Sequence, residues 1–522
     1  MNRPGKNGGP ASPVWTIPLS LSRWSTLNTA AWLMLLLATA VVGLSLIVTF
    51  GRSFGMWGDE LGSLAIVRLD WNDFIRFFAE SNDLHPPLYY SLAKVAGLGS
   101  IRDGYVAYPW VPDDLPYRTF GAVFYLITLS LLAWYAWRHS SARWGLAIAA
   151  VVMTLSAPFL YLYSEFRMYG MLTSLAVATL LAISELSPSA GWRRHGLVAV
   201  LMWLMMLTHY FGIIVAGAVV VAYVVVGRFT PTFLGSALKI SGGAAALMVP
   251  YLPVLIGHIS NTTPYSRTLA QAVGYARQGL VHPTISFVLL GIVGWGAIVV
   301  MRNQRRSKSD RFADHTLLLT VASVLVMIGG AVVAQVVTGS AILTFSTVIV
   351  PVTFIFIAVG LSLAMVPRGF VVVAAIPILV GSVASIEIGL SDATYFEANR
   401  LSYRDIIERV DFDSLVTNGE LVVVTDAKDR EFKRYVVRMV ERRYPEVEIM
   451  HVDRDVMKEI TALSNVSAAT SGPDATSVVL LSRSWGPLLG LGGVYGEAGL
   501  RTAIPGMGAL VVHADEQDTA NK

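Results

Sequence analysis

The sequence contains no cysteine and has few charged residues. None of its 522 residues is Cys, which excludes disulfide bonds, thiolate nucleophiles and zinc sites built on thiolates. Charged residues make up only 14% of the chain and apolar residues 54%, which departs far from the composition of soluble domains. The sequence also lacks a basic stripe or a nucleic-acid-binding module, so we expect no nucleic acid among its partners. This composition indicates a membrane protein.

Long uncharged stretches recur along the chain, and most are long enough to cross about 30 Å of hydrocarbon as a helix. The predicted fold class is therefore a polytopic α-helical membrane protein, with membrane lipids around it. We predict about eleven spans, at residues 30–50, 119–137, 144–163, 168–186, 196–209, 211–227, 237–257, 283–301, 316–338, 341–365 and 369–390.

Lysine and arginine lie in alternate loops, most densely in the run MRNQRRSKSDR at 301–311. Because cytoplasmic loops carry the excess of these residues, we predict a cytoplasmic tail at residues 1–29. The first span begins too far along the chain for a cleaved signal peptide and is expected to be retained. The opposite face then receives the loop at 51–118, the outer ends of several spans and the C-terminal region. The acidic and aromatic features gather on that face, as expected of a site built from several loops.

After the last predicted span the composition becomes that of a soluble domain. Three short apolar runs, at 420–426, 447–453 and 477–483, are typical of strands, and charged segments of helical pattern lie between them. This alternation predicts a small α/β domain with a parallel sheet. We therefore divide the rest of the chain into a transmembrane domain at 30–390 and an extracytoplasmic domain at 391–522.

The loop at 51–118 concentrates charge next to the first span. Asp59 and Glu60 form an acidic pair, and carboxylates this close to a membrane normally face water or a site. An aspartate within reach of a hydroxyl can take its proton and raise its nucleophilicity, although an isolated acidic pair is also typical of a solvated loop. His85, which precedes two prolines, is open between a phosphate contact, a metal ligand and a polar residue of a turn. Two candidate ligands do not make a metal site, so a divalent cation stays an open option.

Two further polar segments fall at the outer ends of predicted spans. Arg167 and Tyr169 belong to the segment YSEFRMY. A guanidinium offers a planar fork that suits phosphate oxygens, and the alternative is a pair with Glu165 that only ties helices together. His209 and Tyr210 lie at another helix end, where a lone histidine is usually structural and a tyrosine usually belongs to the interfacial belt. They are candidate site residues only because they share a face of the membrane with the acidic pair and the arginine.

In their order and spacing, these segments resemble the GT-C glycosyltransferases that use polyprenyl-phosphate sugars. They are most similar to the family 39-like proteins, which are related to protein O-mannosyltransferases and to the aminoarabinose transferases of lipid A. The resemblance is strongest over about residues 50–215. The matching segments are Gly58-Asp59-Glu60, Asp83–Tyr90, Tyr117–Phe120, Ser164–Tyr169, Thr208–Phe211 and Tyr403-Arg404-Asp405.

The resemblance implies an inverting transferase at the outer face of the cell inner membrane. Its donor would be a sugar on a polyprenyl phosphate, and its acceptor a hydroxyl of an envelope lipid, glycan or protein. By resemblance, Asp59 is the general base and Glu60 assists or orients it. By the same resemblance, Arg167, with His85 and Tyr169, would bind the phosphate and stabilise its developing charge. His209 and Tyr210 would line the donor or acceptor site.

The sequence departs from the family at one place. Relatives often carry an Arg-Tyr pair near the outer start of a late span, whereas this sequence reads SAILTFSTVIVP at 340–351 and has no basic residue there. Either another cation, such as Lys94, Arg118 or Arg267, substitutes, or the phosphate site is weaker or altered and the chain is a divergent or inactive member.

Two other classes of function compete with the transferase. A transporter or flippase of lipid-linked saccharide predicts ionisable residues near mid-membrane and some repeat symmetry. The charges of this sequence instead lie at the ends of spans, and no repeat is evident. The other class is a catalytically inactive scaffold of an envelope complex, with the C-terminal domain as its docking module.

Overall fold

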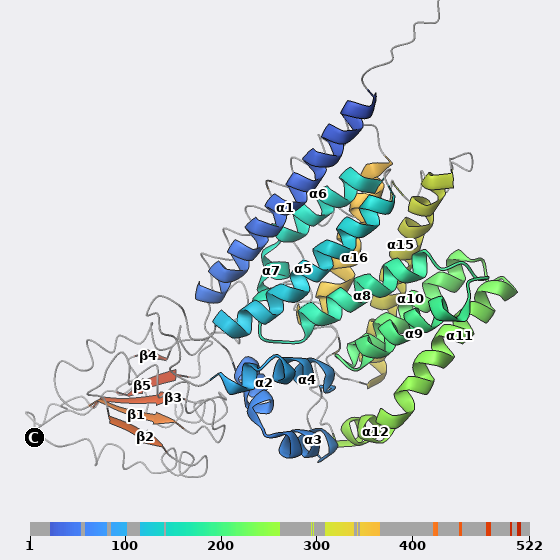
Figure 1. Ribbon diagram of the computed structural model, residues 1–522. Helices are drawn as coiled ribbons and strands as arrows, with labels where there is room; N and C mark the ends of the chain where they lie inside the picture. The colour runs from blue at the N-terminus through green and yellow to red at the C-terminus, as the bar shows by residue number, and fades with distance from the viewer. Residues whose placement is uncertain are drawn as a thin grey trace, which may run out of the picture.

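The computed structural model describes most of the first 261 residues and selected parts of the remainder. The described residues are 21–53, 58–80, 85–101, 115–139, 142–261, 308–338 and 345–365, the single residues 294, 296, 342 and 380, and the strands 421–425, 448–451, 477–481, 502–503 and 509–512. Over these ranges the chain is mainly a bundle of helices, with short helices gathered at one end (Figure 1).

The bundle is formed by the long apolar segments, because a helix satisfies its own backbone hydrogen bonds where no water is present. Among the described residues, five segments are long and apolar enough to cross a membrane. The number is six if the bent helix pair at residues 143–164 counts as one span. The chain is thus a multi-pass membrane protein. The bundle helices are α1 (Leu21–Ser53), α5 (Leu115–Arg138), α6 (Arg143–Thr154), α7 (Ala157–Ser164), α8 (Tyr169–Ser184), α9 (Trp192–Met206), α10 (Phe211–Val226), α11 (Pro231–Met248), α15 (Lys308–Thr338) and α16 (Phe345–Ala364). The five long segments are Thr29–Phe50, Leu115–Arg138, Pro231–His258, Ala313–Val337 and Thr347–Ala364.

The predicted span at 144–163 is a bent pair of helices rather than one straight helix. α6 and α7 meet at an angle of 70°. Pro158 stands in the first turn of α7, where a proline is well tolerated, but its missing N–H cannot continue the hydrogen-bond ladder of α6. Apart from residues 294, 296 and 380, the predicted spans at 283–301 and 369–390 lie outside the described residues, so the number of spans stays a prediction.

Close packing holds the interior of the bundle together. A Cβ built on Gly145 of α6 would lie 1.9 Å from the carbonyl oxygen of Gly360 in α16. Glycine at both positions therefore lets the two backbones touch, as small residues do between membrane helices. Elsewhere, the Thr128 hydroxyl lies 2.8 Å from that of Tyr163 and 2.9 Å from that of Ser174. These bonds join α5, α7 and α8.

Three short helices follow α1: α2 (Gly58–Arg68), α3 (Trp71–Glu80) and α4 (Leu88–Val95). α3 is amphipathic, with Phe74 and Phe78 buried and Ile75 exposed. Its first turn is capped by Asp70, whose carboxylate accepts the backbone N–H of Asp73 at 2.9 Å. That bond lowers the pKa of Asp70.

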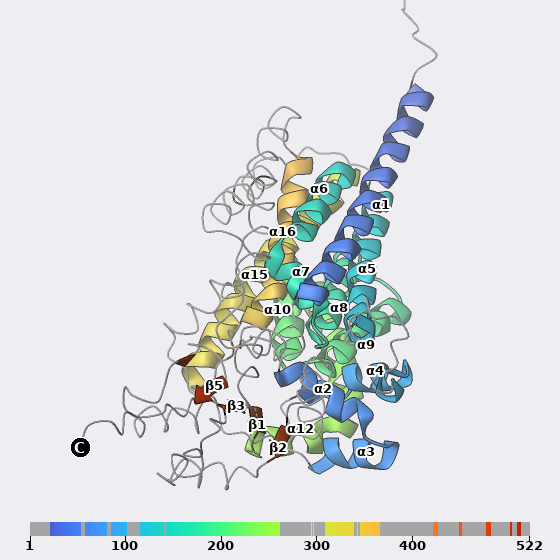
Figure 2. The ribbon, with the colours of Figure 1, turned by 90° about the vertical axis from the view of Figure 1, so that its left-hand side faces the viewer.

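Both views place these helices at the end of the bundle away from the start of α1 (Figures 1 and 2). α12 (Leu252–Asn261), which continues α11 beyond the short turn η3 (Val249–Tyr251), lies at the same end beside α3. We call this the site end of the bundle, and the end where α1 begins the opposite end.

The C-terminal region contributes a five-stranded sheet in the order β2-β1-β3-β5-β4. All three predicted strands are present, and they pair in parallel as expected. Two antiparallel strands that the sequence analysis did not foresee complete the sheet. The helices predicted between the strands lie outside the described residues, so the α/β domain stays a prediction. The strands are β1 (Leu421–Thr425), β2 (Glu448–His451), β3 (Ser477–Leu481), β4 (Thr502–Ala503) and β5 (Ala509–Val512).

Candidate functional site

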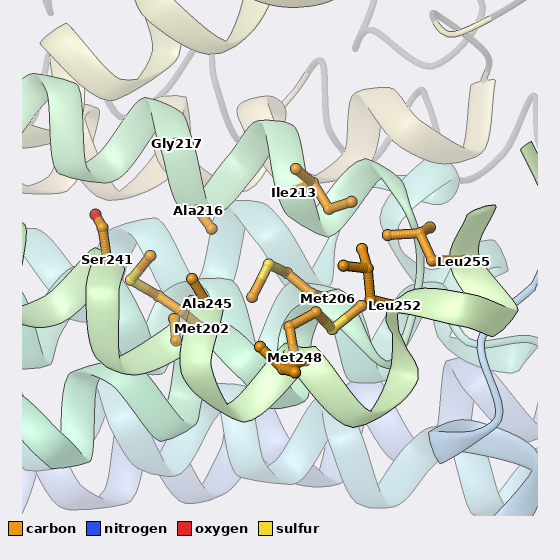
Figure 3. Close-up of a pocket in the computed structure, with 12 residues that line it drawn as sticks. Met202, Met206, Ile213, Ala216, Gly217, Ser241, Ala245, Met248, Leu252 and Leu255 are labelled. Atoms are coloured by element: carbon orange, nitrogen blue, oxygen red, sulfur yellow. The ribbon is translucent and has the colours of Figure 1, made fainter.

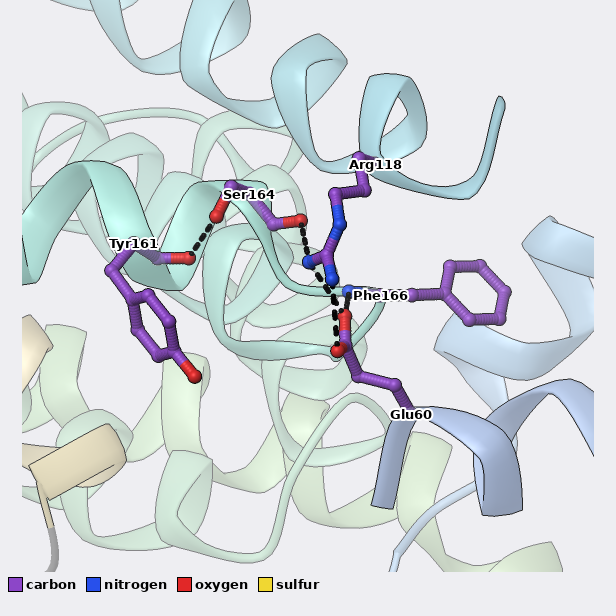
Figure 4. Close-up of polar contacts among 5 residues, drawn as sticks. All are labelled: Glu60, Arg118, Tyr161, Ser164 and Phe166. Carbon is purple, nitrogen blue, oxygen red and sulfur yellow. Dashed lines mark hydrogen bonds and ion pairs between the residues drawn. The ribbon is translucent and has the colours of Figure 1, made fainter. Parts of the chain in front are cut away.

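Glu60, in the first turn of α2, is only 1% exposed. Its Oε1 accepts a hydrogen bond from Nη1 of Arg118 at 3.0 Å and another from the backbone N–H of Phe166 at 2.6 Å. The same Nη1 of Arg118 donates to the carbonyl oxygen of Ser164 at 2.9 Å (Figure 4). One carboxylate therefore joins α2, α5 and the segment between α7 and α8. We call these four residues the Glu60 clasp.

Gly121 allows α5 to approach the end of α7 closely. A Cβ at that position would lie 2.1 Å from the carbonyl oxygen of Tyr163. Gly121 is one helical turn beyond Arg118, so the same face of α5 supplies both the contact and the cation. Because the clasp is buried and its charges are matched, breaking it by removing one partner should cost about 3–5 kcal/mol.

A second group of side chains surrounds Arg167, which is 5% exposed. Its Nη1 donates to the hydroxyl of Ser63 at 3.1 Å, and its Nη2 donates to Nε2 of His85 at 3.2 Å. Arginine has only donors, so His85 accepts through Nε2 and carries its proton on Nδ1. The rings of Tyr169 and His209 complete the Arg167 group: Cζ of the arginine lies 5.9 Å from the Tyr169 ring.

The histidine rings of this group are close to each other. The His209 ring centroid is 5.5 Å from that of His85 and 5.7 Å from that of Tyr169. Nδ1 of His209 accepts the backbone N–H of Phe211 at 3.0 Å, which leaves the ring proton on Nε2. Burial, and then the nearby His85 and Arg167, hold the pKa of His209 well below its usual value. His209 is therefore a neutral N–H donor near pH 7.

Two donors of the Arg167 group have no acceptor in the part of the chain that the structure describes. Among the described residues, neither Nε2 of His209 nor the hydroxyl of Tyr169 has a hydrogen-bond partner. The group thus combines a buried guanidinium with two neutral donors available to a ligand. Such a set is suited to an oxyanion.

Tyr210 belongs to a different cluster, although it is adjacent to His209. Its hydroxyl lies 2.5 Å from Nδ1 of His258 and 3.3 Å from the hydroxyl of Tyr251. Nε2 of His258 is 3.3 Å from the carbonyl oxygen of Phe78, so it carries the proton and Nδ1 accepts from Tyr210. These contacts tie the start of α10 to α12 and α3.

The structure does not test the predicted role of Asp59 as the general base. Asp59 is the second residue of α2, and its side chain is outside the described ones. Of the cations considered in place of the missing Arg-Tyr pair, Arg118 is held in the clasp. Lys94 donates to the carbonyl oxygens of Val67 and Leu69 at the end of α2. Arg267 lies outside the described residues. In the described part of the chain, no group of three or more His, Asp or Glu side chains could hold a metal ion.

The sequence analysis missed Ser63, His258 and the buried position of Tyr89. Ser63 follows Asp59 by four residues, so helical spacing alone placed it on the same face of α2. Tyr89 is fully buried, and its hydroxyl has no partner among the described residues. Burial raises the pKa of Tyr89 well above its usual value. His258 has no local sequence signal, because its partners are 48 and 180 residues away.

An apolar cavity of about 450 Å³ lies between α9, α10, α11 and α12 (Figure 3). Methionine and aliphatic side chains make up nearly all of its wall. Ile213 and Leu252 line its site end, and they follow closely on Tyr210 and Tyr251. The cavity therefore reaches the part of the bundle where the polar clusters lie. Its lining residues are Met202, Met206, Ile213, Ala216, Gly217, Ser241, Ala244, Ala245, Met248, Val249, Leu252 and Leu255.

No family model matches the chain, and no curated protein matches it by sequence. Among solved structures, it is similar to ArnT from Cupriavidus metallidurans bound to undecaprenyl phosphate, with 13% identity, a TM-score of 0.48, and coverage of 94% of this chain and 99% of that one. It is also similar to the oligosaccharyltransferase AglB from Archaeoglobus fulgidus in complex with an inhibitory peptide and a dolichol-phosphate, with 11% identity, a TM-score of 0.46, and coverage of 87% and 69%.

The arabinofuranosyltransferase AftD from mycobacteria is a third similar structure, with 17% identity and a TM-score of 0.46 over 92% of this chain and 40% of that one. All three are glycosyltransferases of the GT-C superfamily, the group that the sequence motifs resemble. At these identities and TM-scores, the likeness assigns no activity, substrate or partner to this chain. Function has to be argued from the site.

Proposed function

We propose that the chain is an inverting glycosyltransferase that moves a sugar from a polyprenyl phosphate to a hydroxyl of an envelope lipid, glycan or protein. The Arg167 group carries this proposal. Its guanidinium and the two open donors, on Tyr169 and His209, form a preorganised site for a phosphate. As the phosphate departs, negative charge grows on its oxygens, and donors already aimed at it lower the barrier. The neutral state of His209 provides a hydrogen bond without adding a charge that must be buried.

Asp59 is the general base in this proposal. It precedes Ser63 by four residues on α2, so the two positions share one helix face, and the Ser63 hydroxyl is bonded to Arg167. The acceptor hydroxyl gives its proton to Asp59 as its oxygen attacks the anomeric carbon. The bond from that carbon to the phosphate oxygen breaks on the other side, and the lipid phosphate leaves with the electron pair. Glu60 acts through the clasp, as a positioning residue for α2.

The apolar cavity supports a lipid-linked donor. Its wall is hydrocarbon and thioether, and its site end adjoins Tyr210 and Tyr251. An isoprenoid chain in the cavity would leave its phosphate at the site end, near the Arg167 group. A lipid-phosphate donor also suits the outer face of a bacterial inner membrane, where nucleotide sugars are absent.

Transfer by the purified protein tests the proposal. Radiolabelled polyprenyl-phosphate sugars are supplied with envelope acceptors, with and without a divalent cation, to wild type, Asp59→Asn and Arg167→Ala. We expect wild type to use at least one donor and each variant to lose about a hundredfold or more of that turnover. Thermal unfolding should show that both variants are folded.

The matched control is Asp73→Asn, which removes the charge of an exposed carboxylate in the same loop. Oδ1 of Asp73 lies 3.7 Å from Nη1 of Arg76. It should keep wild-type turnover. Unchanged turnover in Asp59→Asn would show that the base is another group. If wild type neither turns over nor binds any polyprenyl-phosphate sugar, the transferase proposal is wrong.

A further inference from the structure

A cluster of aromatic and basic side chains lies at the opposite end of the bundle. Arg143, the first residue of α6, places its Cζ 5.4 Å from the ring of Trp32 in α1 and 5.8 Å from the ring of Trp137 in α5. The two tryptophan rings are 6.3 Å apart. Nη1 of Arg143 donates to the Thr29 hydroxyl at 3.1 Å. We call these four residues the Arg143 cluster.

Two donors of the cluster lack an acceptor. Nε of Arg143 and Nε1 of Trp32 are both buried, and neither has a hydrogen-bond partner in the described part of the chain. Trp32 is 1% exposed. Buried donors are nearly always satisfied in folded proteins, and an orphan often marks a missing water, ion or ligand. Two orphans in one cluster therefore point to an absent acceptor.

The charge of Arg143 is also uncompensated. Among the described residues, no carboxylate lies within 4 Å of it. Glu185, at the same end of the bundle, is already taken: its Oε1 is 3.2 Å from Nε of Arg138 and 3.1 Å from Nε2 of His139. A partly buried guanidinium without a counter-ion attracts an anion, and it prefers one with oxygens that can accept several of its N–H groups.

Exposed apolar side chains lie beside the cluster. Trp137 is 56% exposed, and Trp134, one turn before it on α5, is 44% exposed. Exposed apolar side chains continue along α5 at Val123 and Ile127. Exposed tryptophans of this kind mark the depth of lipid headgroups. The missing acceptor is thus expected to be attached to a hydrocarbon chain.

We propose that the Arg143 cluster binds the phosphate of an anionic phospholipid. The guanidinium donates to the phosphate oxygens between the two indole rings, and the acyl chains lie along the exposed apolar side chains of α5. An anionic headgroup is preferred to a zwitterionic one, because its net negative charge balances the Arg143 guanidinium. The described residues place no carboxylate within 4 Å of that guanidinium. Basic pockets between membrane helices commonly bind anionic headgroups in this way. The site is independent of the proposed transfer reaction.

Lipid titration of the full-length protein in neutral detergent tests the proposal. Phosphatidylglycerol and phosphatidylcholine of the same acyl chains are added, and the bound lipid is counted by native mass spectrometry. Wild type should prefer phosphatidylglycerol by about fivefold, and Arg143→Gln should lose that preference. Arg193→Gln is the matched control. It removes another arginine at the same end, which stacks on the exposed Trp192 at 5.7 Å, and it should keep the preference.

Two further arms distinguish the sources of the anion and protect against a folding defect. Trp137→Leu removes one wall of the cluster at an exposed position and should weaken phosphatidylglycerol binding even if Arg143→Gln does not fold. Inorganic phosphate should not displace the lipid. The proposal is overturned if phosphate alone competes at equal concentration, if Arg143→Gln keeps the wild-type preference, or if Arg193→Gln loses as much of it.

Discussion

Two buried arginines at the site end of the bundle have different surroundings. Arg118 is bonded to a carboxylate and a carbonyl oxygen, and its partner Glu60 also accepts a backbone N–H. Arg167 donates to a hydroxyl and an imidazole, and its neighbours Tyr169 and His209 keep donors that have no acceptor among the described residues. The Glu60 clasp is therefore complete without a ligand, whereas the Arg167 group is not. Under the proposed function, the difference separates a group that holds the fold from one that is prepared for a substrate.

The largest effect is expected from Glu60→Ala. It leaves the Arg118 guanidinium and the Phe166 N–H buried without an acceptor, so we expect a loss of about 3–5 kcal/mol in the free energy of unfolding. Denaturation of the detergent-solubilised protein measures it. Replacing both partners, as Glu60→Gln with Arg118→Met, should recover part of that loss. A Glu60→Ala protein of wild-type stability that transfers no sugar would instead make Glu60 a catalytic residue.

Arg167→Lys is expected to act on transfer instead of stability. Lysine keeps the charge, but it lacks the planar fork that reaches Ser63 and His85 together. We expect turnover to fall by about tenfold or more, with little change in the melting temperature. A kinetic assay with the donor identified for wild type measures it. Equal losses of stability in Arg167→Lys and Glu60→Ala would remove the distinction between the two groups.

The pH dependence of stability is the third test. The pKa of His209 is lowered in the folded protein, so the unfolded chain binds a proton more readily than the folded one. The contribution of His209 to stability is complete above its usual pKa of 6.5 and is lost as the pH falls below it. The melting temperature of wild type should therefore fall more between pH 7 and pH 5 than that of His209→Gln. Parallel curves would mean that folding does not lower the pKa of His209.

The smallest effects come from a pair of tyrosine variants. Tyr210→Phe removes the hydrogen bond to His258 and should cost about 1 kcal/mol of stability, while turnover stays within about twofold of wild type. Tyr169→Phe removes a donor that has no protein acceptor, so stability should be unchanged and turnover should fall severalfold. Melting curves and the transfer assay on the same preparations separate the two. The reverse pattern would place Tyr210 in the substrate site.

Local patterns predicted the elements better than their contacts. The apolar runs located the helices, and the strands β1, β2 and β3 lie where alternating apolar segments predicted them. The polar motifs pointed to His85, Arg167, Tyr169 and His209, and these four residues lie in one group in the structure. The bond between Glu60 and Arg118 spans 58 positions, and no local pattern reports which of several buried cations a carboxylate meets.

The sequence also could not predict that His209 and Tyr210, which are neighbours in the chain, belong to different clusters. Both stand at the turn before α10, and their side chains contact different groups. Only the packing of α12 and α3 decides that Tyr210 meets His258. The bend between α6 and α7 was missed for another reason: hydropathy measures how apolar a segment is and carries no information about its direction.

That bend sets the expected depth of the proposed phosphate site. The twelve residues of α6 rise about 18 Å, and the eight residues of α7, turned by 70°, add only about 4 Å in the same direction. With α6 beginning at one edge of a hydrocarbon layer about 30 Å thick, we expect the segment that carries Arg167 to lie below the opposite membrane surface. At that depth the dielectric constant is low, and the guanidinium attracts a phosphate more strongly than it could in water. A headgroup that is already anchored to a membrane lipid reaches this level directly, whereas a freely dissolved sugar phosphate would first have to shed its hydration shell.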